Sequence, residues 1–194
     1  MIGNILKSLL YTVIAGFVLL IIIVLLAGQP TVYDHAWGAF VMRWLHVVSG
    51  VMWIGLLWYF NFVQIPSMPN IPDEQKPAIG KVIAPAALFW FRYAALATVV
   101  TGALVAWMNG YIGAALALTP PVLAIGIGMW IALVMAFNVW FIIWPNQQKA
   151  LGMVEVTPEA KAAAAKLAMQ TSRINTMLSI PMLFMMVAQQ NGGL

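Results

Sequence analysis

The 194-residue chain contains no cysteine, and only 7% of its residues are charged. Without thiols it can form no disulfide and no iron–sulfur cluster, and it cannot attach a c-type haem covalently. A soluble domain carries roughly a quarter charged residues, whereas here 63% of all residues are hydrophobic. We therefore expect an all-α integral membrane protein whose main partner is the lipid bilayer. The net charge of +4 does not indicate nucleic-acid binding, because the charges flank apolar runs.

Carboxylates are also missing from the apolar stretches, since all five Asp and Glu residues fall in the segments between them. Proton pumps and cation transporters usually rely on carboxylates inside the membrane. The sequence also lacks a visible inverted repeat of the kind that many transporters use. A transport function is therefore the least favoured interpretation.

Crossing a bilayer takes roughly 20 apolar residues, and the apolar runs predict a single transmembrane domain over residues 1–194, built as a five-helix bundle. The first run is almost purely aliphatic and is expected to face lipid outside a core of four helices. Pro66 is expected to end the second span, and Thr157 to cap a lead-in helix that begins at Pro158. The expected spans are about 9–27, 39–65, 84–108, 121–144 and 174–188, with an amphipathic lead-in helix over about 158–173.

The basic residues between these spans predict the orientation. They all fall on one side of the expected membrane, and the positive-inside rule makes that side cytoplasmic. The N-terminus is then cytoplasmic and the C-terminus outside. The residues concerned are Lys7, Lys76, Lys81, Lys149, Lys161, Lys166 and Arg173.

Small residues at every fourth position mark the third and fourth spans. Small side chains let helix backbones approach closely where lipid provides no hydrophobic drive. We therefore expect these two helices to pack as a tight antiparallel pair. The two stripes are Ala94, Thr98, Gly102 and Ala106, and Gly128, Ala132 and Ala136.

The second span carries a polar face, because its polar and ionisable residues, together with a glycine, a tryptophan and a leucine, recur at steps of three and four. His46 is the only histidine inside an apolar stretch, at the expected depth of Thr98 and Thr101. It could be a haem ligand, alone or with a methionine or a second chain, or a proton-transfer group, or simply a histidine bonded to a neighbouring helix. The face comprises Arg43, His46, Gly50, Trp53, Leu57, Asn61 and Gln64.

Arg92 lies within the third span without any carboxylate in the membrane to pair with. It could extend toward the surface, or face inward and bind an anion such as a carboxylate, a haem propionate or an acidic substrate. The second interpretation predicts an anion-binding layer at one depth. Its members are Arg92, Asn138, Arg173 and Asn175.

Three motifs in order give the chain a family resemblance. They are WLHV at 44–47 with WIG at 53–55, NVWFIIWPNQ at 138–147, and SRIN at 172–175 with LSIPMLF at 178–184. With these motifs the chain resembles the membrane part of the PuuD-type urate hydroxylases, the urate oxidase N-terminal domain family. Leu-His and Trp-x-Gly patterns also suggest a more distant similarity to HemJ-like and CopD-like membrane proteins.

The resemblance implies a multi-pass protein of the bacterial inner membrane that takes part in purine catabolism. Such a protein oxidises urate and passes electrons to a cytochrome c, which here would be a separate protein because the chain has no cysteine. Haem b is the candidate cofactor, with His46 as a candidate ligand of its iron and Trp53 beside it, and Arg43 joins them on physical grounds alone. The family motifs select His46, Trp53, Asn138, Trp144, Asn146, Arg173 and Asn175.

A noncatalytic accessory subunit of a larger membrane complex is the competing interpretation. The aliphatic first span and the small-residue stripes would then serve as contact surfaces, and oligomers of the chain itself would also be compatible with them.

Overall fold

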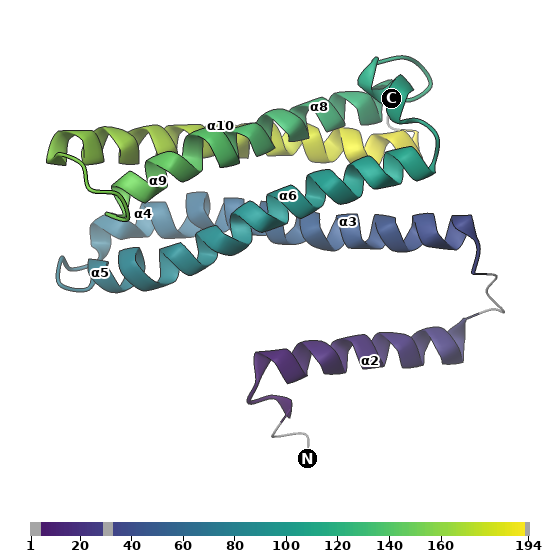
Figure 1. Ribbon diagram of the computed structural model, residues 1–194, viewed down its shortest axis with the longest axis horizontal. Helices are drawn as coiled ribbons and strands as arrows, with labels where there is room; N and C mark the ends of the chain where they lie inside the picture. The colour runs from purple at the N-terminus through teal and green to yellow at the C-terminus, as the bar shows by residue number, and fades with distance from the viewer. Residues whose placement is uncertain (1–4, 29–32, 193–194) are drawn as a thin grey trace. The chain divides into compact units, whose positions relative to one another are not determined.

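The computed structural model describes residues 5–28 and 33–192. Within these residues the secondary structure is entirely helical, which confirms the all-α class. Internal contacts divide the chain into two units, Met1–Gly38 and Ala39–Leu194. Each unit is described separately below, and Figure 1 labels their helices.

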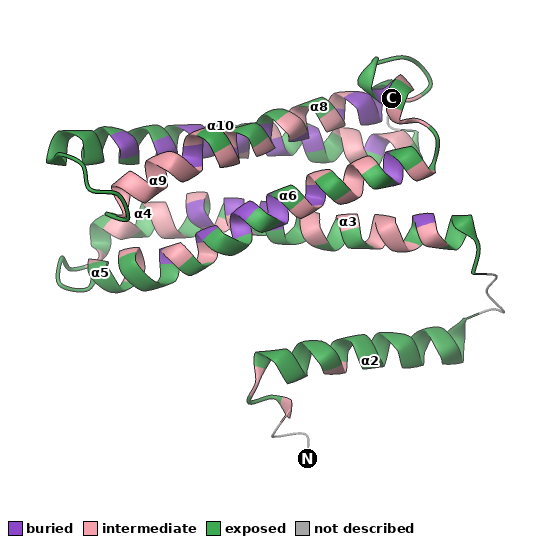
Figure 2. Ribbon diagram, viewed as in Figure 1, coloured by how far each residue is buried: buried purple, intermediate pink, exposed green. Residues whose placement is uncertain are grey.

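The first unit contains α2 (Leu9–Ala27), which buries none of its residues. Its aliphatic and β-branched side chains are exposed along the whole helix (Figure 2). A mean hydropathy of 3.1 makes α2 the most apolar of the candidate membrane spans. A helix that is hydrophobic on every side is stable only inside a core or a membrane.

The second unit is a bundle of four long helical stretches (Figure 1). Its helices in chain order are α3 (His35–Trp58, which starts in the first unit), η1 (Tyr59–Gln64), α4 (Ile65–Ser67), η2 (Met68–Asn70), α5 (Lys76–Ala78), η3 (Ile79–Ile83), α6 (Ala84–Met108), α7 (Ile112–Leu116), α8 (Leu123–Phe137), η4 (Asn138–Ile143), α9 (Trp144–Ala150) and α10 (Pro158–Asn191).

Four helical stretches of the described chain are long and apolar enough to cross a membrane, and they run over Leu9–Ala27, His35–Asn70, Lys76–Met108 and Leu123–Ala150. Helix α10 is the longest helix, with 34 residues, but it is not among them. Its second half carries Asn175, Ser179 and Gln189, which lower its hydropathy. At the start of α10, Thr157 accepts a hydrogen bond from the Ala160 N–H at 3.3 Å, so the predicted cap is confirmed.

Prolines do not end the second and fourth spans, contrary to the expectation for Pro66. The segments η1, η3 and η4 are π-helical, and each is followed two residues later by a proline, namely Pro66, Pro85 and Pro145. Proline lacks an N–H and its ring clashes with the carbonyl four residues earlier, which in all three cases belongs to the π-helical segment. The wider π turn moves that carbonyl away, so the helix continues through the proline.

The two glycines of the small-residue stripes do not face each other. A Cβ added to Gly128 of α8 would lie 3.2 Å from Met185 Cβ of α10. On α6, a Cβ at Gly102 would lie 2.7 Å from His46 Cε1 of α3. The pattern therefore predicts close approach correctly, and at these two glycines the neighbours are α10 and α3, while α6 and α8 also contact each other.

The core of the second unit lies where the four stretches face one another, as the buried positions in Figure 2 show. Phe60 and Phe91 meet edge to face with ring centroids 5.7 Å apart, and Trp53, Leu57 and Met135 are fully buried. Edge-to-face pairs contribute about 0.5–1.5 kcal/mol beyond burial. These contacts fix α3 and η1 against α6 and α8.

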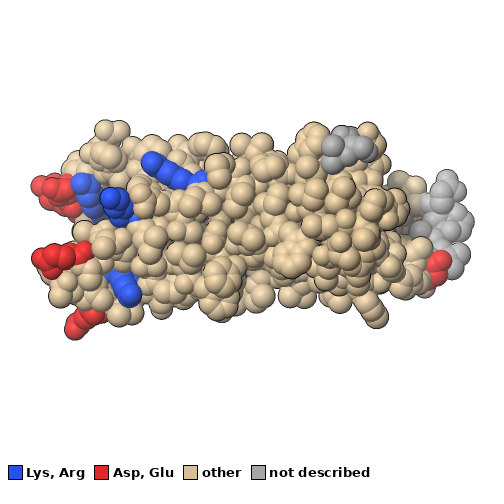
Figure 3. Space-filling model, turned by 90° about the horizontal axis from the view of Figure 1, so that it is seen from above, with Lys and Arg blue, Asp and Glu red and all other residues tan. Residues whose placement is uncertain are grey.

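Charged side chains gather at one end of the second unit (Figure 3). We call it the charged end. The segments that join its helices there contain Asp73, Lys76, Lys149 and Glu155. The three π-helical segments lie toward the same end, because each is next to one of these connections.

Candidate functional site

His46 links α3 to α6 through one side of its ring. Its Nδ1 lies 2.9 Å from the Thr98 carbonyl oxygen and 3.3 Å from Thr101 Oγ1. A carbonyl can only accept, so this geometry assigns the proton to Nδ1, which donates to Thr98, and leaves the lone pair on Nε2. The structure thus brings together the three residues that the sequence placed at one depth.

This tautomer fits a haem ligand. Metal-binding histidines usually donate their second ring N–H to a carbonyl or carboxylate, which orients the ring, and His46 does so toward Thr98. The same bond also suits a histidine that only connects two helices. No group of three or more His, Cys, Asp or Glu residues within the described ranges could hold a metal ion, so a metal here would need a prosthetic group such as haem.

Arg43 and Trp53 share a helix with His46, but the three side chains do not meet at one point. They spread over ten residues of α3, about 15 Å. The positive charge of Arg43 acts on Tyr111, where burial raises the pKa of the phenol and Arg43 partly opposes that rise. Trp53 is fully buried in the core, and its Nε1 has no hydrogen-bond partner among the described residues.

Arg92 is buried in α6, with 9% of its surface exposed. Its guanidinium carbon lies 3.3 Å from the ring centroid of Trp144 and 6.0 Å from those of Tyr93 and Trp140. Cation–π contacts of this kind contribute about 0.5–2 kcal/mol each. The partner of the membrane arginine is therefore a cluster of aromatic rings. We call Arg92, Tyr93, Trp140 and Trp144 the arginine cluster.

Several donors of the arginine cluster are unused. Nε and Nη1 of Arg92 and Nε1 of Trp140 are buried and have no hydrogen-bond partner in the described part of the chain. Tyr93 meets Trp140 edge to face at 5.7 Å and so holds its ring in place. Buried donors without partners cost about 1–3 kcal/mol each, and more when charged, so this cluster is suited to a ligand with acceptor atoms and negative charge.

Asn138 and Asn175 bond to each other. The Asn138 amide donates to Asn175 Oδ1 at 2.8 Å, and the Asn175 amide donates to the Met135 carbonyl at 2.9 Å. Asn175 is fully buried. The pair therefore joins α10 to the point where α8 becomes η4, and it fixes the segment that carries Trp140.

Arg173 lies apart from this pair. Its side chain is exposed on α10, while Ser172 and Asn175 point into the bundle. Asn146 donates to the Ile142 carbonyl of its own helix at 2.8 Å. Of the predicted anion layer, the structure thus buries Arg92 and joins the two asparagines, and it places Arg173 outside.

Trp140 and Tyr93 were not among the predicted site residues. A signal for them is present in the sequence, because Trp140 and Trp144 are four residues apart and so share one face of a helix. Tyr93 directly follows the arginine. Paired aromatics at helical spacing are a plausible partner for a membrane cation that has no carboxylate.

Comparison with known proteins adds one match. No curated protein and no solved structure matches the chain. The family model described as urate oxidase N-terminal matches residues 122–192. This segment contains Asn138, Trp140, Trp144 and Asn175, whereas His46 and Arg92 precede it. The resemblance to the urate oxidase N-terminal family is thus confirmed over α8 to α10, while the more distant HemJ-like and CopD-like similarity stays a prediction.

Proposed function

We propose that the chain is a membrane protein of the urate hydroxylase type and that it binds urate at the arginine cluster. The observation that carries this proposal is Arg92, a buried arginine stacked on Trp144 at 3.3 Å with two donor nitrogens unpaired. Both Trp144 and the adjacent Trp140 lie in the segment that matches the urate oxidase N-terminal family. The geometry and the family match thus point to one place.

Urate suits these groups chemically. It is a flat anion at neutral pH, with several carbonyl oxygens at its edge. Those oxygens can accept from Arg92 Nε and Nη1 and from Trp140 Nε1, and bonds between charged groups are about twice as strong as neutral ones. The absence of carboxylates from the apolar stretches leaves the arginine charge available for the ligand. Asn138 and Asn175 act by positioning η4.

Oxidation of urate releases electrons, which need an acceptor. In this proposal His46 would hold a haem b through Nε2, and Arg43 and Trp53 would contribute from the same helix. The haem supplies one-electron chemistry, and a separate cytochrome c receives the electrons. Arg173, exposed on α10, contributes to attraction of the anion toward Arg92 rather than contact with it.

The membrane arrangement belongs to the same proposal. We take α10 as a fifth span whose first turns lie in the interface, so that residues 1–194 form one transmembrane domain. The charged end then faces the cytoplasm of a bacterial cell, the N-terminus is cytoplasmic and the C-terminus is outside. The arginine cluster is thereby reachable from the cytoplasm, where purine catabolism supplies urate.

Urate binding to the purified protein in lipid nanodiscs tests the proposal. Urate is expected to quench tryptophan emission saturably, because Trp140 and Trp144 are in the cluster, and Arg92→Gln should raise the Kd at least tenfold. Arg173→Gln removes the same charge at an exposed position and is the matched control, with an expected change below about threefold. Equal weakening by both variants, or no saturable binding to the folded protein, would contradict the proposal.

One observation favours the accessory-subunit alternative, namely that α2 has no buried residue. A second membrane protein could pack along it, although lipid covers such a helix equally well. Replacing α2 by an unrelated span of leucine and alanine separates the two cases. Loss of a co-purifying partner at fixed stoichiometry would support the subunit role, and retained urate binding without partners would argue against it.

A further inference from the structure

A cavity of about 110 Å³ opens inside the second unit near the charged end. All three π-helical segments contribute to its wall, through Phe60 and Gln64 of η1, Gly80 of η3 and Ile143 of η4. π-helical turns inside α-helices are frequent at functional sites. The same prolines that widen the three helices therefore shape a single cavity.

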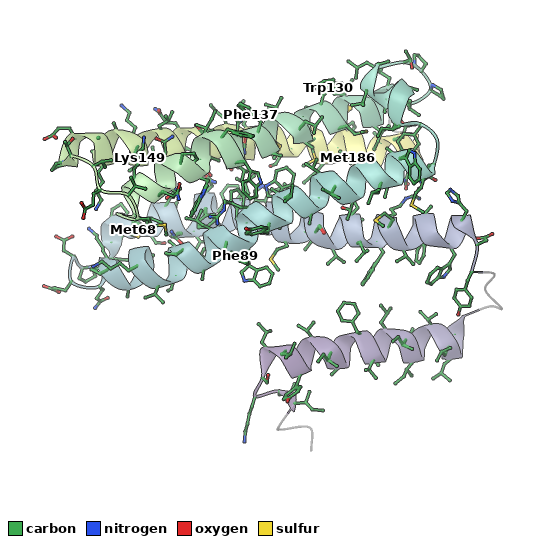
Figure 4. The ribbon with its side chains drawn as sticks, viewed as in Figure 1. Met68, Phe89, Trp130, Phe137, Lys149 and Met186 are labelled. Atoms are coloured by element: carbon green, nitrogen blue, oxygen red, sulfur yellow. The ribbon has the colours of Figure 1, made fainter. Side chains whose placement is uncertain are left out.

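The residues at the inner end of the cavity are buried, and those at its rim are half-exposed. Phe60, Phe91 and Ser172 are buried, whereas Met68 and Gly80 are half-exposed. Met68 lies toward the charged end, as does Lys149 (Figure 4). A ligand could thus place one ring inside, against the edge-to-face pair of Phe60 and Phe91, and extend the rest of its structure through the rim.

The polar groups of the wall are amides and a hydroxyl. Gln64 Oε1 is buried and has no hydrogen-bond partner among the described residues. Ser172 Oγ accepts from the Asn61 amide at 2.8 Å, so its own proton is available. Gln147 adds a second amide to the wall. No charged side chain is among the described residues that line the cavity, so its ligand is neutral and both donates and accepts.

The volume restricts the ligand to one ring. An apolar cavity of about 150 Å³ can hold a benzene molecule, so this cavity of about 110 Å³ must widen to admit a six-membered ring. The walls are mostly apolar, which suits a molecule that dissolves in the bilayer. The unpaired Gln64 Oε1 can accept a hydrogen bond from a hydroxyl on that ring. The Gln147 amide and the Ser172 hydroxyl can donate to an oxygen on the opposite side of the ring.

We propose that this cavity binds the ring of a membrane-soluble quinol. One ring hydroxyl donates to Gln64 Oε1, the opposite oxygen accepts from Gln147 or Ser172, and the apolar tail leaves through the half-exposed rim beside Met68. This site is distinct from the arginine cluster, and it does not depend on urate binding. It adds a neutral, lipid-soluble ligand to a protein whose proposed substrate is an anion.

The test uses tritium-labelled decylubiquinol and the full chain in detergent micelles, with bound label counted after rapid gel filtration. Gln64→Leu removes the acceptor and should raise the Kd about tenfold. Gly80→Val fills the rim without a backbone clash, since a Cβ at Gly80 would meet only Leu151 at 3.9 Å. Gly55→Val is the matched control, because nothing lies within 4 Å of a Cβ there.

Saturable binding of one quinol per chain that Gln64→Leu and Gly80→Val both weaken, with Gly55→Val unchanged, supports the site. Retention of label by all four proteins alike would overturn it, because the quinol would then dissolve in the micelle or bind elsewhere. No retention by the folded wild-type protein would also overturn it and would leave the cavity to water. Circular dichroism and gel filtration establish that each variant is folded.

Discussion

Adding one methyl group at Gly102 tests the contact between α3 and α6. A Cβ at this position would lie 2.7 Å from His46 Cε1 and 3.1 Å from His46 Nδ1. Both distances are shorter than van der Waals contact allows, so the imidazole ring must move. Because the ring is rigid and tied to the Thr98 carbonyl at 2.9 Å, Gly102→Ala forces that hydrogen bond to lengthen or break.

The expected magnitude follows from three contributions. Overpacking in a well-packed region costs about 1–3 kcal/mol, and loss of the His46 hydrogen bond costs about 1 kcal/mol. Replacing glycine by alanine in a helix contributes about 0.5–1 kcal/mol in the opposite direction. Gly102→Ala should therefore lower the free energy of unfolding by about 1–3 kcal/mol.

Equilibrium unfolding in mixed micelles, followed by circular dichroism, provides the measurement. Gly55→Ala is the matched control, since it makes the same substitution on α3 where nothing lies within 4 Å, and it should be neutral or stabilising. In a His46→Ala background the cost of Gly102→Ala should disappear, because the clashing ring is gone. The reasoning fails if Gly102→Ala matches Gly55→Ala, or if its cost persists without the imidazole.

Three further predictions concern other parts of the bundle. Asn175→Ala should destabilise the fold by about 1–3 kcal/mol, because it removes the acceptor of the Asn138 amide and one donor to the Met135 carbonyl; equal unfolding curves for variant and wild type would argue against this. Arg43→Gln should raise the pKa of Tyr111 further, because the positive charge favours the phenolate. Tyrosinate absorbance during alkaline titration measures that change, and a fall in the pKa would contradict it. If haem is bound, His46→Ala should abolish or shift the reduced-minus-oxidised visible band, and an unchanged band would place the ligand elsewhere.

The sign of the Tyr111 shift also fixes its effect on stability. Burial holds the pKa above its ordinary value, so the neutral phenol is the form favoured by the fold. Its contribution is complete below the pKa of the unfolded chain and is lost as the pH rises through the folded value. A rise in pH through the folded pKa of Tyr111 should therefore lower the free energy of unfolding of the second unit. Tyr111→Phe should remove this contribution to the pH dependence of stability.

The sequence predicted the helical class and the inward face of His46, because hydropathy and helical spacing are local properties. It could not identify which helix each face meets. The glycines illustrate the limit: spacing indicated that Gly102 and Gly128 permit close approach, but their neighbours prove to be His46 and Met185. Partner choice depends on how all helices fill the bundle together, which no single stripe encodes.

Proline usually ends a helix, but this rule is too simple for long membrane helices. A proline ends a helix in water because its missing N–H and its ring remove one bond and crowd a carbonyl. Inside a membrane a broken helix would leave further backbone groups unpaired, which is more costly. A π-helical turn before Pro66, Pro85 and Pro145 is the less costly solution.

The distribution of unpaired polar groups separates the two ends of the second unit. At the end away from the charges, the His46 ring is bonded to α6, and Arg43 has a buried Nε without a partner among the described residues. Toward the charged end, Arg92, Trp140 and Gln64 all have buried atoms without partners in the described chain. Such atoms are costly in a low-dielectric interior, and a ligand that completes their bonds recovers that cost. Binding of urate and quinol is therefore expected where π-helical turns, aromatic rings and unpaired polar groups coincide, whereas the His46–Thr98 bond connects α3 to α6.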